Sequence, residues 1–217
     1  MRNSAAAFGT GLASLAVFLF LLMEVTYLGH FVWLDNAVNE MTGRQSAWII
    51  LLSKGLHYLF SMISMIIMTA AMAFILWRKI GKREAILIAG LMLLGAGIDQ
   101  LIKFLVARPR PANALIALSN ASFPSGHTSA TTIFFGIMCM ILLPRLTSGL
   151  PRIFMISVST FIVALVGFSR LSLHVHWLTD VLAGLALGGV VVSAGVLAQD
   201  FFSTAKPPTA SARKKSR

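Results

Sequence analysis

Long apolar runs separated by short polar stretches dominate the pattern of hydrophobic and polar positions along this chain. A helix needs roughly 20 apolar residues to cross the hydrocarbon of a bilayer, and six runs come close to that length or exceed it. No alternation of period two is sustained, which argues against a transmembrane β-barrel. The pattern therefore predicts an all-α fold, a bundle of six transmembrane helices. The predicted spans are residues 8–29, 57–77, 84–106, 124–143, 153–169 and 178–199.

The segment between the first two spans, residues 30–56, has a different pattern. Apolar residues recur there at spacings of three and four, among charged residues and beside Trp33. Such a pattern is typical of an amphipathic helix in the membrane interface, where tryptophan is favoured. We therefore expect an extracytoplasmic interfacial helix in this segment; the alternative is an ordinary extramembrane loop. The charged residues are Asp35, Glu40, Arg44 and Lys54.

Composition favours the same class of protein. The chain is 57% hydrophobic and 12% charged, whereas a soluble domain carries roughly a quarter charged residues. Residues 1–205 are predicted to form a single integral membrane domain. The basic residues 206–217 are predicted to form a disordered cytoplasmic tail. The single cysteine, Cys139, has no partner for an internal disulfide.

The placement of lysine and arginine predicts the topology, because cytoplasmic loops carry an excess of both. The side of the bundle that holds both termini carries 12 of the 18 lysines and arginines, and the other side carries 6. Both termini are therefore predicted to be cytoplasmic, in a multi-pass protein of the inner (plasma) membrane. The first run is too long for a signal-peptide core, which indicates a retained helix. The basic tail is expected to contact anionic lipid headgroups rather than nucleic acid.

Three polar stretches fall at the opposite, periplasmic or exterior, face. The first leaves the third span and contains Lys103, Arg108 and Arg110. The second, residues 123–127, enters the fourth span, and the third, residues 169–180, links the fifth span to the sixth. Odd-numbered spans end at the face where spans four and six begin, so we expect the three stretches to lie together.

Three side chains in these stretches are cations, namely Lys103, Arg110 and Arg170. Arginine presents a planar fork of donors that matches the oxygens of a phosphate. Three cations at one interface suit a phosphoryl group and its more highly charged transition state. This part of the pattern predicts an anion site.

The start of the fourth span adds backbone donors to that site. Pro124 is well placed at a helix start, where its missing N–H is not needed. The N–H groups of Ser125, Gly126 and His127 would then be free, and a helix N-terminus with free amides binds anions. Gly126 would allow a phosphate to approach the backbone closely, and the Ser125 hydroxyl could donate one more hydrogen bond.

His176 and Asp180 are four residues apart, which places them on one face of a helix. A carboxylate in that position holds the imidazole in one tautomer and stabilises its positive form, which leaves the other ring nitrogen free to attack. Histidine is an established covalent nucleophile. His127 would then be available as the acid that protonates the leaving oxygen.

These residues resemble the three-part signature of the type 2 phosphatidic acid phosphatase family. Its pattern is lysine, six residues, Arg-Pro; then Pro-Ser-Gly-His; then Ser-Arg, five residues, histidine, three residues, aspartate. The chain matches every position, with Lys103 to Arg110-Pro111, Pro124 to His127, and Ser169-Arg170 to His176 and Asp180. The resemblance covers roughly residues 84–199.

The resemblance implies a metal-independent reaction in two steps without a cofactor. His176 would form a phosphohistidine, His127 would protonate the departing lipid oxygen, and water would release phosphate. The phosphoryl oxygens would be held by Lys103, Arg110, Arg170, Ser125 and the Gly126 amide. A zinc site is a poor fit to the histidine spacing. The family also includes soluble haloperoxidases, an activity that six membrane spans make improbable.

Several further polar residues lie close to the predicted site or to the ends of spans, and two of them allow two interpretations. Asp99 could neutralise Lys103 on the third span or support it from behind. We expect Arg108 to contact headgroups at the rim and His174 to be a bystander. Glu24 is expected to snorkel to the interface; lining a lipid entrance is the alternative.

Other residues are expected to serve the membrane fold. His30 and His57 are predicted to be interfacial, and Trp177 to mark the membrane boundary. Three glycines in the sixth span are expected to permit close helix packing. They are Gly184, Gly188 and Gly189.

The sequence thus predicts a membrane lipid phosphatase whose partners are its lipid phosphate substrate and the surrounding lipids. Undecaprenyl pyrophosphate, phosphatidylglycerol phosphate and phosphatidic acid all fit as substrates. One alternative is phosphotransfer from a polyprenyl pyrophosphate to another lipid. A transporter of anions or lipids is a weaker alternative, because transporters place polar residues near the bilayer midplane. The oligomeric state is not readable from the pattern.

Overall fold

The structure, a computed structural model, describes residues 2–204. The predicted tail, residues 206–217, lies outside the described residues. Short helical turns extend three of the helices, at Glu24–Leu28, Thr42–Arg44 and Leu143–Arg145. The main helices are α1 (Arg2–Met23), α2 (Val32–Met41), α3 (Ala47–Leu59), α4 (Met62–Lys79), α5 (Lys82–Val106), α6 (Gly126–Leu142), α7 (Leu150–Ser172) and α8 (Leu178–Thr204).

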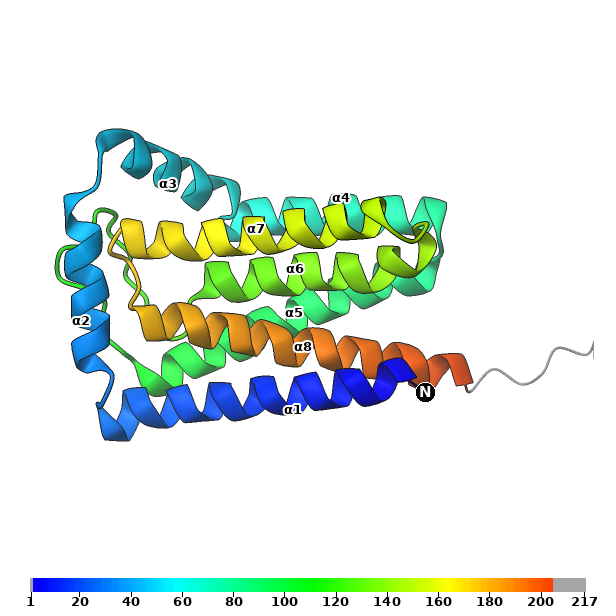
Figure 1. The fold of residues 1–217 in the computed structure, drawn as a ribbon, viewed down its shortest axis with the longest axis horizontal. Coiled ribbons are helices and arrows are strands. Elements are labelled where there is room, and N and C mark those ends of the chain that lie inside the picture. Colours follow the sequence, from blue (N-terminus) through cyan, green and yellow to red (C-terminus); the bar gives the residue numbers. More distant parts are fainter. Residues whose placement is uncertain (1, 205–217) are drawn as a thin grey trace, which may run out of the picture.

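Six of these helices are long and apolar enough to cross a membrane, among the residues that the structure describes. They are α1 with its π-helical extension, α4, α5, α6, α7 and α8. Figure 1 shows them running side by side, with α2 lying crosswise over one end of the bundle. The start of α1 and the end of α8 lie at the opposite end. The predicted all-α bundle of six membrane helices is therefore confirmed.

The predicted interfacial segment consists of two helices, and the second, α3, includes the short apolar piece at residues 47–53, which is too short to cross a membrane. After α2 the chain makes a short 3₁₀ turn, and Gln45 and Ser46 then take extended conformations before α3 begins. α3 is amphipathic, since Trp48 and Leu51 are exposed while Ser53 and His57 are buried. Its contacts with α7 are more extensive than those with α4, so its polar side faces the bundle.

The second predicted span, residues 57–77, began too early. Residues 57–59 belong to α3, and α4 begins at Met62 after a break at Phe60 and Ser61. The Ser61 hydroxyl accepts a hydrogen bond from the Ser64 N–H and so caps α4. The hydropathy pattern could not show this break, because apolar residues continue through it. The fifth span is longer than predicted, from residue 150 to residue 172.

α8 is the central helix of the bundle. It packs against both α1 and α6. Half of the residues in its apolar membrane-spanning stretch are buried within the bundle, compared with 11% in α1 and in α7. A β-carbon added to Gly184 would lie 2.7 Å from the Ser125 carbonyl oxygen, and one on Gly188 would lie 2.5 Å from Thr132. Gly189 faces Ser14 of α1 at a similarly short distance. The expectation that these glycines permit close packing is confirmed.

Candidate active site

The three polar stretches meet at the end of the bundle that α2 crosses. The Ser125 N–H donates to the Asp180 carbonyl oxygen (3.0 Å), which joins the starts of α6 and α8. The Leu115 N–H donates to the Leu173 carbonyl oxygen (2.9 Å), which joins the loop after α5 to the loop before α8. These backbone contacts hold segments that are far apart in sequence in one site.

The imidazole of His176 has a hydrogen-bond partner on each ring nitrogen. Nδ1 lies 3.3 Å from Asp180 Oδ2, and Nε2 lies 3.3 Å from Arg110 Nη1. A carboxylate accepts and a guanidinium donates, so these partners assign the proton to Nδ1 and leave a lone pair on Nε2. That tautomer is the one a histidine nucleophile requires.

The surroundings of His176 also favour its neutral form. Burial lowers the pKa of this imidazole to about 4, although Asp180 acts in the opposite direction. The positive charges of Arg110 and Lys103 lower this pKa further. Near neutral pH the ring is therefore uncharged, and its lone pair faces a guanidinium that a phosphate could displace.

The N-terminus of α6 presents free backbone donors. The helix begins at Gly126 with Ser125 as its N-cap, two residues later than predicted. The Ser125 N–H is not free as expected, because it donates to the Asp180 carbonyl oxygen; the N–H groups of Gly126, His127 and Thr128 donate to no residue that the structure describes. The Ser125 hydroxyl lies 3.0 Å from the Thr128 hydroxyl. The set of free N–H donors predicted at this helix start is thus shifted by one residue, from 125–127 to 126–128.

Lys103 is buried beside that helix start. Its amino group lies 3.2 Å from Asp99 Oδ2 and donates to the Pro124 carbonyl oxygen. Asp99 also accepts a hydrogen bond from Ser129 and lies close to Gly126, where an added β-carbon would meet its carboxylate at 3.0 Å. Asp99 therefore pairs with Lys103 and also lies next to the first residue of α6.

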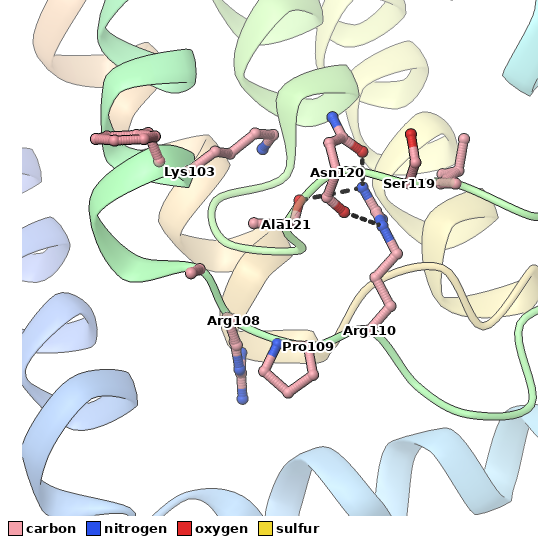
Figure 2. Close-up of a pocket in the computed structure, with 10 residues that line it drawn as sticks. Lys103, Arg108, Pro109, Arg110, Ser119, Asn120 and Ala121 are labelled. Carbon is pink, nitrogen blue, oxygen red and sulfur yellow. Dashed lines mark hydrogen bonds between the residues drawn. The ribbon is translucent and has the colours of Figure 1, made fainter.

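Arg110 and Lys103 line a cavity of about 610 Å³ at the end of α5. Asn120 accepts from Arg110 through both its backbone and side-chain oxygens, at 2.9 and 2.7 Å. Figure 2 shows Lys103 reaching from α5 toward the loop that carries Asn120, while Arg110 and Arg108 point in opposite directions. The two arginines of this loop therefore have different surroundings.

Arg170 is fully buried and contacts α3. Its Nη1 donates to His57 Nδ1 (2.8 Å), and its Nη2 donates to the Ser53 carbonyl oxygen (3.5 Å). The His57 ring stacks on His127 with 5.0 Å between centroids, and His127 Nε2 donates to the His57 carbonyl oxygen (3.2 Å). The prediction that His57 is interfacial was wrong, because the ring lies between two residues of the signature.

Arg108 forms two ion pairs within the protein, which the sequence did not predict. Its Nη1 donates to Asp180 Oδ1 (2.5 Å) and its Nη2 to Asp35 Oδ2 (2.7 Å). Asp35 belongs to α2, outside the stretch that carries the signature. No motif marked this residue; only its position as a carboxylate in an amphipathic segment was visible in the sequence.

Glu24 differs from expectation, and His174 and Trp177 make contacts that the sequence did not predict. Glu24 is buried and accepts from the Phe31 N–H (2.6 Å), so it does not snorkel. His174 Nδ1 lies 2.6 Å from the Asn39 side-chain oxygen and so helps to attach α2. Trp177 donates from its indole N–H to the Pro109 carbonyl oxygen (3.0 Å).

Several known proteins are similar to this chain in sequence. Phosphatidylglycerophosphatase B of Bacillus subtilis is 39% identical over 106 residues, which is 45% of this chain and 51% of that protein. Decaprenylphosphoryl-5-phosphoribose phosphatase of Mycobacterium tuberculosis is 36% identical over 116 residues, 51% of this chain and 59% of the relative. Phospholipid phosphatase 2 of Bos taurus is 37% identical over 46% of this chain and 36% of its own length. The chain spans about half the length of the curated relatives it matches, or less.

Two solved structures share the fold. The crystal structure of a transmembrane PAP2 type phosphatidylglycerolphosphate phosphatase from Bacillus subtilis superposes with a TM-score of 0.75 and 25% identity, over 91% of this chain and 98% of that one. Aquifex aeolicus LpxE is alike in fold, with a TM-score of 0.61, 19% identity, and coverage of 76% and 93%. The family model described as PAP2 superfamily matches residues 84–203, which is more than half of the chain and includes all three signature stretches. The chain belongs to the PAP2 superfamily.

Proposed function

We propose that this chain is a membrane enzyme that hydrolyses a phosphomonoester or pyrophosphate on a lipid, through a phosphohistidine on His176. One observation carries the proposal. The unprotonated Nε2 of His176 faces Arg110, while Asp180 holds the opposite ring nitrogen. An attacking nitrogen, its orienting carboxylate and a displaceable cation are the parts that a histidine nucleophile needs.

The phosphoryl group would occupy the space around the start of α6. Lys103, Arg110 and Arg170 would supply the cations, and the Ser125 hydroxyl and the Gly126 N–H would supply neutral donors. In this structure Arg110 makes bonds to backbone and side-chain oxygens of residues 120, 121 and 175. Together with the contact to His176 Nε2, these bonds occupy all five N–H donors of the guanidinium. A phosphate would therefore have to replace some of these contacts, first the one that faces Nε2.

In the first step the Nε2 lone pair of His176 attacks phosphorus, and the bond from phosphorus to the lipid oxygen breaks. That oxygen takes a proton from His127, which becomes neutral. Asp180 stabilises the positive charge that develops on His176. In the second step water attacks phosphorus, His127 takes a proton from that water, and the phosphorus–nitrogen bond breaks. Inorganic phosphate leaves and His176 returns to its neutral state.

The proposed substrates are lipids whose phosphate projects from the membrane surface. Undecaprenyl pyrophosphate, phosphatidylglycerol phosphate and phosphatidic acid share this chemistry. The names of the relatives, which include a phosphatidylglycerophosphatase and a decaprenylphosphoryl-phosphoribose phosphatase, support lipid phosphates as a class. The excess of positive charge at the other end of the bundle supports a site at the extracytoplasmic face. The reaction is proposed to need no metal ion, because lysine and arginine supply the charge.

The test is phosphate release by the purified protein from these three lipids in detergent micelles, with a chelator present. We expect release from at least one lipid and its loss in His176→Ala. His30→Ala removes an exposed imidazole on the same side and serves as the matched control. Full activity of His176→Ala would contradict the proposed nucleophile, and loss of activity in chelator would contradict metal independence.

The same assay separates the other activities. Labelled phosphate that appears on a second lipid, rather than in water, would identify a phosphotransferase that uses the same phosphohistidine. Flux of anions or lipids across vesicles without any phosphate release would identify a transporter. An acid-labile label on the wild-type protein after a brief incubation with labelled substrate, absent from His176→Ala, is the result expected for the phosphohistidine.

A further inference from the structure

Arg108 lies between two buried carboxylates from distant parts of the chain. Asp35 of α2 is 2% exposed and Asp180 of α8 is fully buried. The guanidinium contacts Asp180 Oδ1 at 2.5 Å and Asp35 Oδ2 at 2.7 Å. A buried charge is costly unless it is paired and hydrogen-bonded, so the position of each of these groups depends on the others.

The contacts around Asp180 leave its carboxylate little freedom. Oδ1 accepts from Arg108, while Oδ2 accepts from the Trp177 N–H (3.0 Å) and faces Nδ1 of His176 (3.3 Å). Arg108 therefore occupies the oxygen that the imidazole does not use. If Arg108 were absent, the carboxylate could rotate about its χ2 torsion, and the Nδ1 bond that defines the tautomer would be lost for part of the time.

The hydrogen bonds that Arg108 makes with the described residues all go to Thr179 and to the two carboxylates. Nη1 donates to the Thr179 hydroxyl and to Asp180 Oδ1, and Nη2 donates to Asp35 Oδ2. The guanidinium carbon lies 5.6 Å from the centroid of the Trp177 ring. Figure 2 shows this side chain pointing away from Arg110. Its role is therefore different from that of the arginine two residues later.

α2 supplies Asp35, the carboxylate that pairs with Nη2 of Arg108. Asp35 accepts from both the backbone N–H and the hydroxyl of Thr179, at 2.9 and 2.8 Å. One helical turn later, Asn39 contacts His174 and Asn113. Residues four apart lie on one helix face, so a single face of α2 contacts the loop after α5 as well as the segment that leads into α8.

We propose that Asp35 and Arg108 form a bridge that positions Asp180, and through it the imidazole of His176, for attack on phosphorus. Both are positioning residues, since neither touches the phosphoryl group. The inference rests on the proposed function, in which His176 is the nucleophile. It assigns to α2, which lies outside the stretch matched by the family model, a part in catalysis.

The test compares Asp35→Asn, Arg108→Gln and the double variant. Arg108→Gln is expected to lower kcat by about 10- to 100-fold, because small displacements of a reacting group have effects of that size, with little change in KM. It should also lower the thermal midpoint in detergent, because Asp35 is left buried without its partner. Asp35→Asn is expected to lower kcat less, since Arg108 keeps its contact with Asp180.

The double variant distinguishes an effect on the position of Asp180 from an effect on the stability of the fold. It removes both members of the Arg108–Asp35 pair but leaves Asp180 without Arg108, so we expect it to recover part of the lost thermal midpoint. Its kcat should stay as low as that of Arg108→Gln, since Asp180 still lacks its anchor. Recovery of kcat together with the midpoint would show that the bridge only stabilises the fold and would overturn the inference. A raised KM with unchanged kcat in Arg108→Gln would overturn it as well, in favour of a headgroup contact.

Glu40→Gln and Arg44→Gln are the matched controls. They remove the same charges from exposed positions on α2 and on the turn that follows it, and they should leave kcat and the midpoint unchanged. His176→Ala is measured in parallel. If His176→Ala is fully active, the proposed function fails; if it is inactive while the double variant is restored, only the bridge fails.

Discussion

The imidazole of His57 lies between two groups of the signature. Its Nδ1 accepts from Arg170, and its ring covers His127. Burial, and then the positive charges of Arg170 and Arg110, lower the pKa of His57. The ring is therefore neutral at neutral pH, as it must be for Nδ1 to accept a hydrogen bond. His57 thus fixes the position of a guanidinium that our proposal assigns to the phosphate.

His57→Ala is expected to lower kcat/KM for phosphate release by about tenfold. The reason is that a hydrogen bond to a charged group contributes about 1.5–3 kcal/mol, and 1.4 kcal/mol corresponds to a factor of ten. His57→Asn carries an oxygen acceptor in place of Nδ1 and should retain part of the activity. Equal activity of His57→Ala and the wild type would show that Arg170 does not need the His57 imidazole as a partner.

The residues of the signature could be predicted from the sequence because their spacing and order are specific. The residues around them could not. Asp35 and His57 contact Arg108 and Arg170 across more than 70 and 110 positions of the chain, and nothing in their own segments marks them. Arg108 was visible, but its direction depends on Asp35 and Asp180, which no spacing rule connects.

At the scale of elements, the close contact between α8 and α6 determines the shape of the site. Gly184 faces the Ser125 carbonyl oxygen, in the same turn where the Ser125 N–H bonds Asp180. A side chain at this position would meet backbone rather than a flexible side chain. The distance between His176, which precedes α8, and the N-terminus of α6 depends on this glycine.

Gly184→Ala is therefore expected to lower both the thermal midpoint and phosphate release, because overpacking of this kind costs about 1–3 kcal/mol. The comparison is Gly97→Ala on α5, where an added β-carbon meets no atom within 4 Å. Alanine favours helix more than glycine does, so this control should be neutral or slightly stabilising. Similar losses in both variants would contradict the role assigned to the α6–α8 contact.

The lengths of the elements were predictable where polar residues end an apolar run and unpredictable where they do not. Gly81 and the charged residues around it mark the boundary between α4 and α5. The break between α3 and α4, in contrast, depends on the hydroxyl of Ser61 within a run that remains apolar. The hydropathy pattern therefore assigned the last residues of α3 to the second predicted membrane span.

At the scale of the whole molecule, the two ends of the bundle differ in charge and in structure. One end carries α2 and the site, and the other carries the start of α1 and the short turns between α4 and α5 and between α6 and α7 (Figure 1). The distribution of lysine and arginine predicts that the site end faces the exterior. This orientation can be tested without any activity assay.

Single cysteines introduced by Ser119→Cys and Ser148→Cys, in a Cys139→Ser background, should differ in labelling. Ser119 is exposed in the loop after α5, and Ser148 is exposed between α6 and α7. A membrane-impermeant maleimide applied to intact cells or spheroplasts is expected to label only the first variant. After the membrane is opened with detergent, both should react. Labelling of only the Ser148→Cys variant in sealed cells would reverse the predicted topology.

The charged groups that line or support the site nearly cancel one another, with four formal positive charges against three negative ones. The four cations are Lys103, Arg108, Arg110 and Arg170, and the carboxylates are Asp35, Asp99 and Asp180. A near-balanced set is less costly to keep at the edge of the hydrocarbon than an array of unpaired cations would be. With His127 protonated, as the proposed first step requires, the set carries two net positive charges, and a dianionic phosphate neutralises it. The loaded site would therefore be close to neutral, which makes the burial of the substrate's charge less costly.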